Sequence, residues 1–138
     1  MSKVSLAVIG FFPSFDCQIV RVNVPLMLAV MRQPLYGRSA EYADNRISLF
    51  SAQWGKCAVS GRELNSIVEI HCHHIIPLKH GGSDKHENLV LVSESAHKLI
   101  HATQKQTIQK YLSELNLNKG QLKNLNAFRE KAKLFPLT

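Results

Sequence analysis

The chain has 138 residues, of which 45% are hydrophobic and 20% charged, a balance typical of a folded domain and not of a disordered chain. Its 17 Lys and Arg outnumber its 10 Asp and Glu and give a formal charge of +7, which favours a polyanionic partner, nucleic acid first. Its three cysteines, an odd and sparse set, exclude a disulfide framework and fit a reducing compartment.

The first 37 residues are largely apolar and carry no assignable chemistry. An apolar run at 4–12 is too short to span a membrane, and the Pro-Ser-Phe-Asp that follows it is no signal-peptide cleavage site. We therefore expect a strand or a core contact there, no membrane segment, and a cytoplasmic protein. Alternation predicts a strand over 17–24, and a short helix over 26–31 is expected to end before Pro34.

Residues 39–54 have the pattern of an amphipathic helix. Ser39 is a suitable N-cap, Glu41 lies in the first turn, and Gly55 is expected to end the helix. Helical spacing predicts a buried stripe and an outer face, formed respectively by Tyr42, Ile47, Phe50 and Trp54, and by Arg46 and Gln53.

The centre of the chain alternates between strand and loop patterns before the next helix. Residues 67–71 are rich in β-forming types, 80–84 have loop composition, and 89–92 are a short apolar strand. Ser93 is then expected to cap a helix that ends at about His101.

Two amphipathic helices close the chain. Their apolar faces hold Ile108, Tyr111, Leu112 and Leu115 in the first helix, and Leu122, Leu125, Phe128 and Ala132 in the second. The span from Lys119 to Lys133 has five basic residues and one acidic residue, and we expect a solvated face there in preference to a DNA contact.

Four histidines form two pairs, His73 with His74 and His97 with His101. On a helix, the i, i+4 spacing of the second pair puts both imidazoles on one face, where one metal ion can bind both. A third nitrogen from a strand end would leave coordination positions for water and substrate. The second pair alone is weak support, since two such histidines are more often ordinary residues. His71, two positions before His73, either supports such a site or has a structural role.

The residues between the two pairs extend this pattern to His-His, Pro, Gly-Gly, Asn-Leu, His and His, over about 30 residues. This order resembles the motif of the HNH endonuclease family from end to end. The resemblance implies an α+β fold with a ββα-metal core, in which a short two-stranded hairpin and a helix surround one divalent ion, flanked here by additional helices. We expect this core, with its preceding helix, at 38–103, an N-terminal extension at 1–37 and a C-terminal helical extension at 104–138.

The resemblance also implies roles for single residues. The metal ligands that it implies are His73, His97 and His101. The general base that it implies is His74, whose ring Asn88 would hold in place. This chemistry is reasonable by itself, because a neutral imidazole can take a proton from water near pH 7 while a divalent ion stabilises charge on phosphate. Neighbours on a regular strand face opposite ways, so the strand has to twist or end at these histidines.

The chain departs from the family at its cysteines. Many relatives bind a structural zinc through two Cys pairs, which would fall here at 57–60 and near 93–96. Only Cys57 is present at these positions, so a zinc site of four cysteines is excluded and packing has to hold the fold. Cys72 alternates with the neighbouring histidines and is expected to be packed.

A narrower resemblance is to the C-terminal endonuclease region of group II intron-encoded reverse transcriptase/maturases, which nicks target DNA so that reverse transcription can be primed. It covers the chain from about residue 25 onward and rests on Glu41-Tyr42, Asn45-Arg46, Gly55-Lys56-Cys57-Ala58-Val59, Ile70-His71-Cys72-His73-His74 and Lys98-Leu99-Ile100-His101-Ala102-Thr103. The given sequence does not contain the reverse transcriptase, so the chain would be a stand-alone relative, a remnant or a fragment. The partners that this resemblance implies are a separate reverse transcriptase or intron RNA.

The first functional hypothesis is an endonuclease that hydrolyses double-stranded DNA. The alternatives are a nucleic-acid-binding module of the same fold that has lost cleavage, and a structural zinc module without nucleic acid. The complete set of five site residues favours the enzyme. Three nitrogen ligands accept Zn²⁺, Ni²⁺ and Mn²⁺, and Mg²⁺ more weakly, which leaves the metal open. Basic residues that flank the motif and are candidates for phosphate contacts are Lys56, Arg62, Lys79, Lys85, Lys98 and Lys105.

Overall fold

The computed structural model describes residues 23–138. The apolar run at 4–12 lies outside the described residues, as does the strand expected at 17–24 except for its last two positions, which begin a helix. No helix in the described part is both long enough and apolar enough to cross a membrane.

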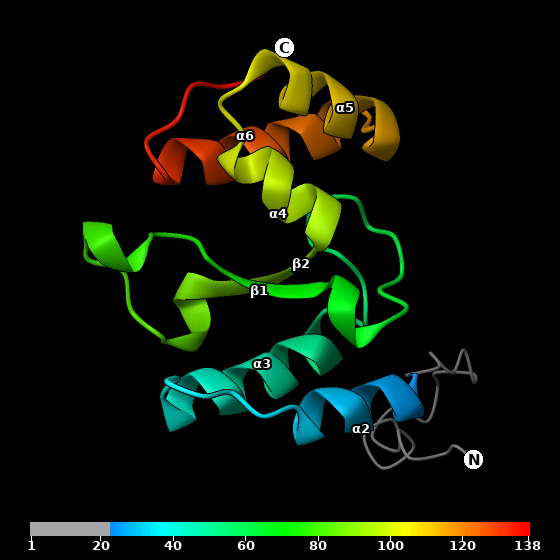
Figure 1. Cartoon of the computed structure of the whole chain (residues 1–138), viewed down its shortest axis with the longest axis vertical. Helices are drawn as coiled ribbons and strands as arrows, with labels where there is room; N and C mark the ends of the chain where they lie inside the picture. Colours follow the sequence, from blue (N-terminus) through cyan, green and yellow to red (C-terminus); the bar gives the residue numbers. More distant parts are fainter. Residues whose placement is uncertain (1–22) are drawn as a thin grey trace, which may run out of the picture.

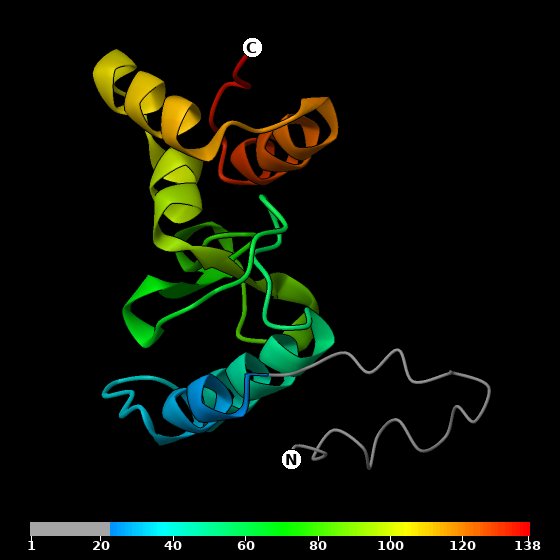
Figure 2. The same cartoon turned by 90° about the vertical axis from the view of Figure 1, so that its right-hand side faces the viewer.

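A two-stranded antiparallel hairpin lies at the centre, with helices on two sides of it (Figure 1). Strand β1 (Ile70–His74) pairs with β2 (Leu89–Ser93), so that Ile70 is opposite Ser93 and His74 is opposite Leu89. The view at 90° shows the same sequence of layers (Figure 2). The α+β fold expected from the motif, a hairpin followed by a helix with further helices around it, is confirmed.

The helices divide into two groups. On one side of the hairpin lie α2 (Val24–Arg32) and α3 (Ala40–Ala52), and α3 contacts β2. On the other side lie α4 (Glu94–His101), α5 (Lys105–Leu115) and α6 (Lys119–Lys131), and α4 contacts both strands. Three 3₁₀ turns, η1 (Ile67–Glu69), η2 (Leu78–His80) and η3 (His86–Asn88), flank the strands. The expectation of β structure from 67 onward was therefore wrong at its start, since the strand begins at Ile70.

Side-chain caps begin the two helices that frame the hairpin. The Ser39 hydroxyl accepts a hydrogen bond from the backbone N–H of Tyr42 at 3.0 Å and starts α3. The Ser93 hydroxyl accepts one from the N–H of Ala96 at 3.2 Å and starts α4. Both N-caps confirm the sequence prediction, because each hydroxyl satisfies an N–H that has no partner within its helix.

The predicted faces of α3 need three corrections. Arg46, expected outside, is only 4% exposed and donates to the side chain of Gln33. Gln53, also expected outside, bonds the backbone N–H and carbonyl of Leu91 at 2.8 and 2.9 Å, where it satisfies the free edge of β2. Trp54 is 51% exposed, because the helix has already ended and this residue adopts a left-handed conformation with φ of 57°.

The basic run on α6 also needs a correction. Arg129 is 3% exposed, not solvated, and its guanidinium donates to the carbonyls of Leu99, Ile100 and Ala102 at 2.9, 3.2 and 2.8 Å. The last carbonyls of a helix have no partners within it. Arg129 thus caps the carboxyl end of α4, the helix that carries two of the four histidines.

Candidate active site

Three imidazoles converge between β1 and α4. His73 comes from the strand, whereas His97 and His101 lie one turn apart on the helix. Each offers a ring nitrogen, and these three atoms all lie within 4.8 Å of one another. A metal ion binds imidazole nitrogen at about 2.0–2.1 Å, so nitrogens this close can share one ion after small side-chain rotations.

The buried nitrogen of His73 fits a metal ligand. Its side chain is 2% exposed, and its Nε2 is a fully buried atom with no hydrogen-bond partner in the described part of the chain. Leaving such a group unsatisfied costs about 1–3 kcal/mol, so buried nitrogens normally have a partner. A bound ion would supply that partner.

Neighbouring rings pack against two of the three histidines. The ring of Phe128, from α6, contacts the His73 ring edge-on at a centroid distance of 5.9 Å. His71 stacks on His97 at 5.0 Å with 15° between the ring planes. The supporting position proposed for His71 is therefore consistent with where its ring lies, beside a candidate ligand and not at its centre.

Burial keeps these rings neutral. It lowers the pKa of His73 to about 3 and that of His97 to about 4, with a smaller contribution from the charges of neighbouring histidines. Burial also lowers the pKa of His101, and the nearby positive charges of Lys79 and Arg129 lower it further. Neutral imidazoles retain the lone pair that binds a metal, so the three residues fit a divalent ion at neutral pH.

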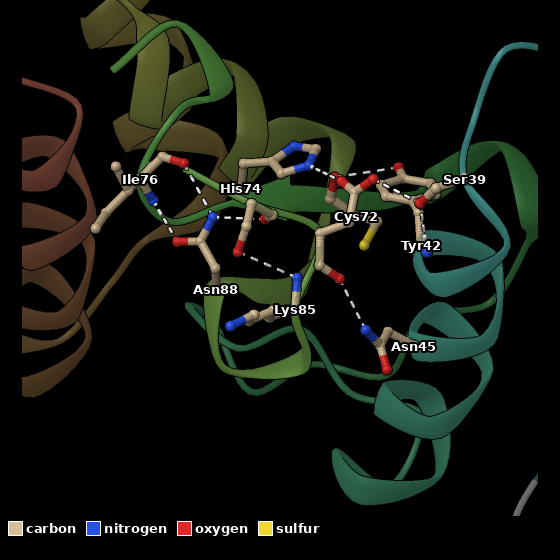
Figure 3. A network of polar contacts seen from close by, with 10 residues as sticks. Ser39, Tyr42, Asn45, Cys72, His74, Ile76, Lys85 and Asn88 are labelled. Carbon is tan, nitrogen blue, oxygen red and sulfur yellow. Dashed lines mark hydrogen bonds and ion pairs between the residues drawn. The ribbon is translucent and has the colours of Figure 1, made fainter. Parts of the chain in front are cut away.

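His74 faces the opposite side of β1 and makes a different contact. Its Nε2 lies 2.8 Å from a carboxylate oxygen of Asp84 (Figure 3). The ring also stacks on Tyr42 from α3, at a centroid distance of 5.6 Å and an interplanar angle of 22°. The strand ends at this residue, as the two adjacent histidines required.

The start of α3 positions Asp84. The Ser39 hydroxyl donates to its second carboxylate oxygen at 2.6 Å, and the Asn45 amide donates to its backbone carbonyl at 2.8 Å (Figure 3). Hydrogen bonds from His74 and then Ser39 lower the pKa of Asp84. The carboxylate is thus ionised at neutral pH and accepts the Nε2 proton of His74. This contact leaves Nδ1 as the nitrogen with the free lone pair.

Asn88 has a different position from the expected one. Its side chain accepts a hydrogen bond from the N–H of Ile76 at 2.8 Å and donates to the carbonyls of Ile76 and Ser83 at 3.0 and 2.8 Å (Figure 3). Within the described residues, Asp84 and not Asn88 contacts the ring of His74. Asn88 instead joins both ends of the loop from which Asp84 reaches that ring.

Gly82 allows this loop to close. A Cβ at this position would lie 1.7 Å from the backbone carbonyl oxygen of Ile76 and 2.9 Å from the Asn88 amide nitrogen. No side chain fits into that space, so only a glycine allows the backbone at position 82 to lie this close to Ile76. Sequence reasoning saw only a loop at 80–84 and missed Asp84. The available signal was an acidic residue in the loop that returns toward the candidate base.

The histidines and His74 line one cavity of about 580 Å³. Of the six basic residues proposed for phosphate contacts, Lys79 alone lines it. The Arg62 guanidinium donates to the carbonyl of Leu115, and Lys98 pairs with Glu94. Lys56, Lys85 and Lys105 do not line the cavity, so their role stays a prediction.

Hydrogen bonds to one thiol join the two segments that hold zinc ligands in many relatives. The Sγ of Cys57 accepts from the backbone N–H groups of Ser60 and Ser93 at 3.5 and 3.3 Å. Burial works to raise the pKa of Cys57, but these hydrogen bonds outweigh it and lower the pKa. Cys72 is half-buried against the core, and burial raises its pKa to about 11.

Residues 57–103, about a third of the chain, match the family model of the HNH endonucleases. The matched segment contains both strands, α4 and all the histidines described above. It supports a metal-dependent nuclease. No curated protein and no solved structure matches the chain.

Proposed function

We propose that this chain is a metal-dependent endonuclease that hydrolyses the phosphodiester bonds of double-stranded DNA. The observation that carries the proposal is the pairing of two unlike histidine environments in one cavity. Three neutral imidazoles, one with an unsatisfied buried nitrogen, lie beside a fourth that a carboxylate orients. Nuclease chemistry needs both, a cation to stabilise charge and a base to activate water.

In this proposal His74 is the general base. Asp84 accepts the Nε2 proton and so selects the tautomer in which Nδ1 can take a proton from water. Stacking on Tyr42 restricts rotation of the ring. Asn88 is a positioning residue, because it fixes the loop that presents Asp84.

His73, His97 and His101 would hold one divalent ion. When bound, such an ion stabilises the negative charge that develops on the phosphate and on the leaving oxygen. The expected products are a 5′-phosphate and a 3′-hydroxyl. The candidate ions are Mg²⁺, Mn²⁺, Zn²⁺ and Ni²⁺. Three imidazole nitrogens bind Zn²⁺ and Ni²⁺ more tightly than Mn²⁺ and Mg²⁺.

A plasmid-nicking assay with His74→Ala tests the proposal. We expect a loss of about 10²–10⁴-fold in rate, the usual contribution of a general base, with the melting-temperature rise on metal addition unchanged. His86→Ala is the matched control, since His86 is exposed in η3 and does not line the cavity.

Three results would count against the proposal. Near wild-type cleavage by His74→Ala would show that His74 is not the base, and cleavage that persists in EDTA would show that no metal is needed. A wild-type chain that binds DNA but cleaves no nucleic acid with any of the four metals would favour the inactive binding module.

We also propose that the chain acts in the cytoplasm with a group II intron or its reverse transcriptase. The support is the resemblance of short segments, from α3 to the end of α4, to the maturase endonuclease region. The expected result is stimulation of nicking when a group II intron ribonucleoprotein is added. Equal nicking with and without it would contradict this part alone.

A further inference from the structure

The cavity that holds the histidines has a basic lining. Three basic residues line it, Arg38, Arg46 and Lys79, and no Asp or Glu is among its lining residues in the described part of the chain. Only Lys79 belongs to the matched segment, since the two arginines come from the region between α2 and α3 and from α3 itself. The helical side of the cavity thus adds charge that the hairpin does not have.

Arg38 lines the cavity and contacts the same aromatic ring as His74. Its guanidinium carbon lies 4.6 Å from the centre of the Tyr42 ring, and that ring in turn stacks on His74. Its charge contributes, after the hydrogen bonds from His74 and Ser39, to the low pKa of Asp84. Stacking on Tyr42 therefore holds the guanidinium within electrostatic reach of the candidate base and its carboxylate.

The guanidinium donors of Arg38 have no acceptor among residues 23–138. The side chain is exposed, and within the described residues it makes no hydrogen bond and no ion pair of 4 Å or less. An arginine that is held by stacking while its N–H fork stays free can bind a planar pair of oxygens. Phosphate oxygens are the matching acceptors in a nuclease substrate.

Arg46 adds a second, buried positive charge to the lining of the same cavity. It is 4% exposed, and its donors go to the Val30 carbonyl and the Gln33 side chain, both of which are neutral. Neither ion pair found among residues 23–138 involves it. A buried cation with neutral partners only favours an anion nearby, because its charge is poorly screened.

We propose that Arg38 forms a phosphate-binding subsite for the substrate strand, next to His74 and separate from the metal ligands. This inference rests on the proposed function for the identity of the strand. Besides Arg38, the cavity is lined by Lys79, whose charge contributes to the lowered pKa of the candidate metal ligand His101. A phosphodiester between them would have a contact at each end.

The test measures DNA binding without cleavage. The full chain, in EDTA, is titrated into a short fluorescein-labelled DNA duplex, and anisotropy gives Kd at salt concentrations from about 50 to 200 mM. For Arg38→Gln we expect Kd to rise about 3- to 10-fold at the lower salt concentration. We expect the slope of log Kd against log salt to fall by about 0.9, the value for one lost phosphate contact.

Two further variants make the measurement specific. Arg32→Gln removes the same charge from the exposed last turn of α2, outside the cavity, and is expected to leave the slope unchanged. Arg38→Lys keeps the charge but loses the fork, and is expected to keep the slope with a weaker Kd. If Arg38→Gln lowers the melting temperature, Arg38→Lys replaces it in the test. A Kd of Arg38→Lys equal to that of wild type would then overturn the proposal.

The outcomes separate this proposal from the proposed function. If the slope of log Kd against log salt depends on Arg38 but the chain never cleaves DNA, the subsite stands and the proposed nuclease function is wrong. If the wild-type chain cleaves DNA and Arg38→Gln has the wild-type slope and KM, only the subsite proposal is wrong. No binding to DNA, or equal slope changes in Arg38→Gln and Arg32→Gln, would also overturn the subsite.

Discussion

Replacing Arg129 by methionine is expected to destabilise the whole fold, although the residue is far in sequence from the histidines. Methionine keeps most of the apolar volume and removes the donors. The carbonyls of Leu99, Ile100 and Ala102 would then lose their charged partner. These three residues are 0%, 0% and 7% exposed, so water cannot easily replace the guanidinium.

The size of the effect follows from these contacts. A hydrogen bond to a charged group contributes about 1.5–3 kcal/mol, and the three share one donor nitrogen, so their energies are not additive. We estimate a loss of about 3–5 kcal/mol in the free energy of unfolding, which is a large part of the 5–15 kcal/mol typical of a domain. For a chain of this length the melting temperature would fall by roughly 10–20 °C.

Urea unfolding followed by circular dichroism, in EDTA, measures this loss. Lys131→Met is the control, because Lys131 is an exposed cation at the end of the same helix, and it is expected to change stability by less than about 0.5 kcal/mol. A loss below about 1 kcal/mol in Arg129→Met would refute the reasoning, since it would mean that the carbonyls find other donors.

Two further predictions concern the histidines. Asp84→Asn keeps the shape of the His74 partner but no longer selects its tautomer, and we expect nicking to fall about 10- to 100-fold with unchanged metal binding; an unchanged rate would contradict the orienting role. The metal-free chain is expected to lose stability as the pH falls from 6.5 toward 4. The unfolded histidines take up protons at their ordinary pKa of 6.5, whereas His73 and His97 in the folded chain do so only at about 3 and 4. Urea titrations near pH 5 should show an uptake of about two protons on unfolding, and a flat pH profile would contradict the burial of these rings.

Local patterns predicted most of the secondary structure. The helix starts at Ser39 and Ser93, the strand over 89–92 and the amphipathic faces of α5 and α6 are all present. These features depend on hydrogen bonds and spacings within a few residues, which a linear reading can detect. The start of β1 was misjudged because β-forming residues at 67–69 adopt a 3₁₀ turn when no partner strand lies opposite them.

The site divides in the same way. Helical spacing pointed to His97 and His101 as one pair, and the resemblance to the HNH motif implied His73 as the third ligand. The structure brings a ring nitrogen of each of these residues within 4.8 Å of the other two. Asp84 could not be chosen from the sequence, since its contact with His74 depends on how the loop closes over Gly82 and Asn88.

The sequence alone determined the residue types that this protein offers for chemistry and the elements that carry them. Only the tertiary structure decided which charges are buried and which reach the cavity. Ser39 meets Asp84 across 45 residues, and Arg129 meets Leu99 across 30. Such contacts depend on the packing of separate elements, whose relative positions no local propensity specifies.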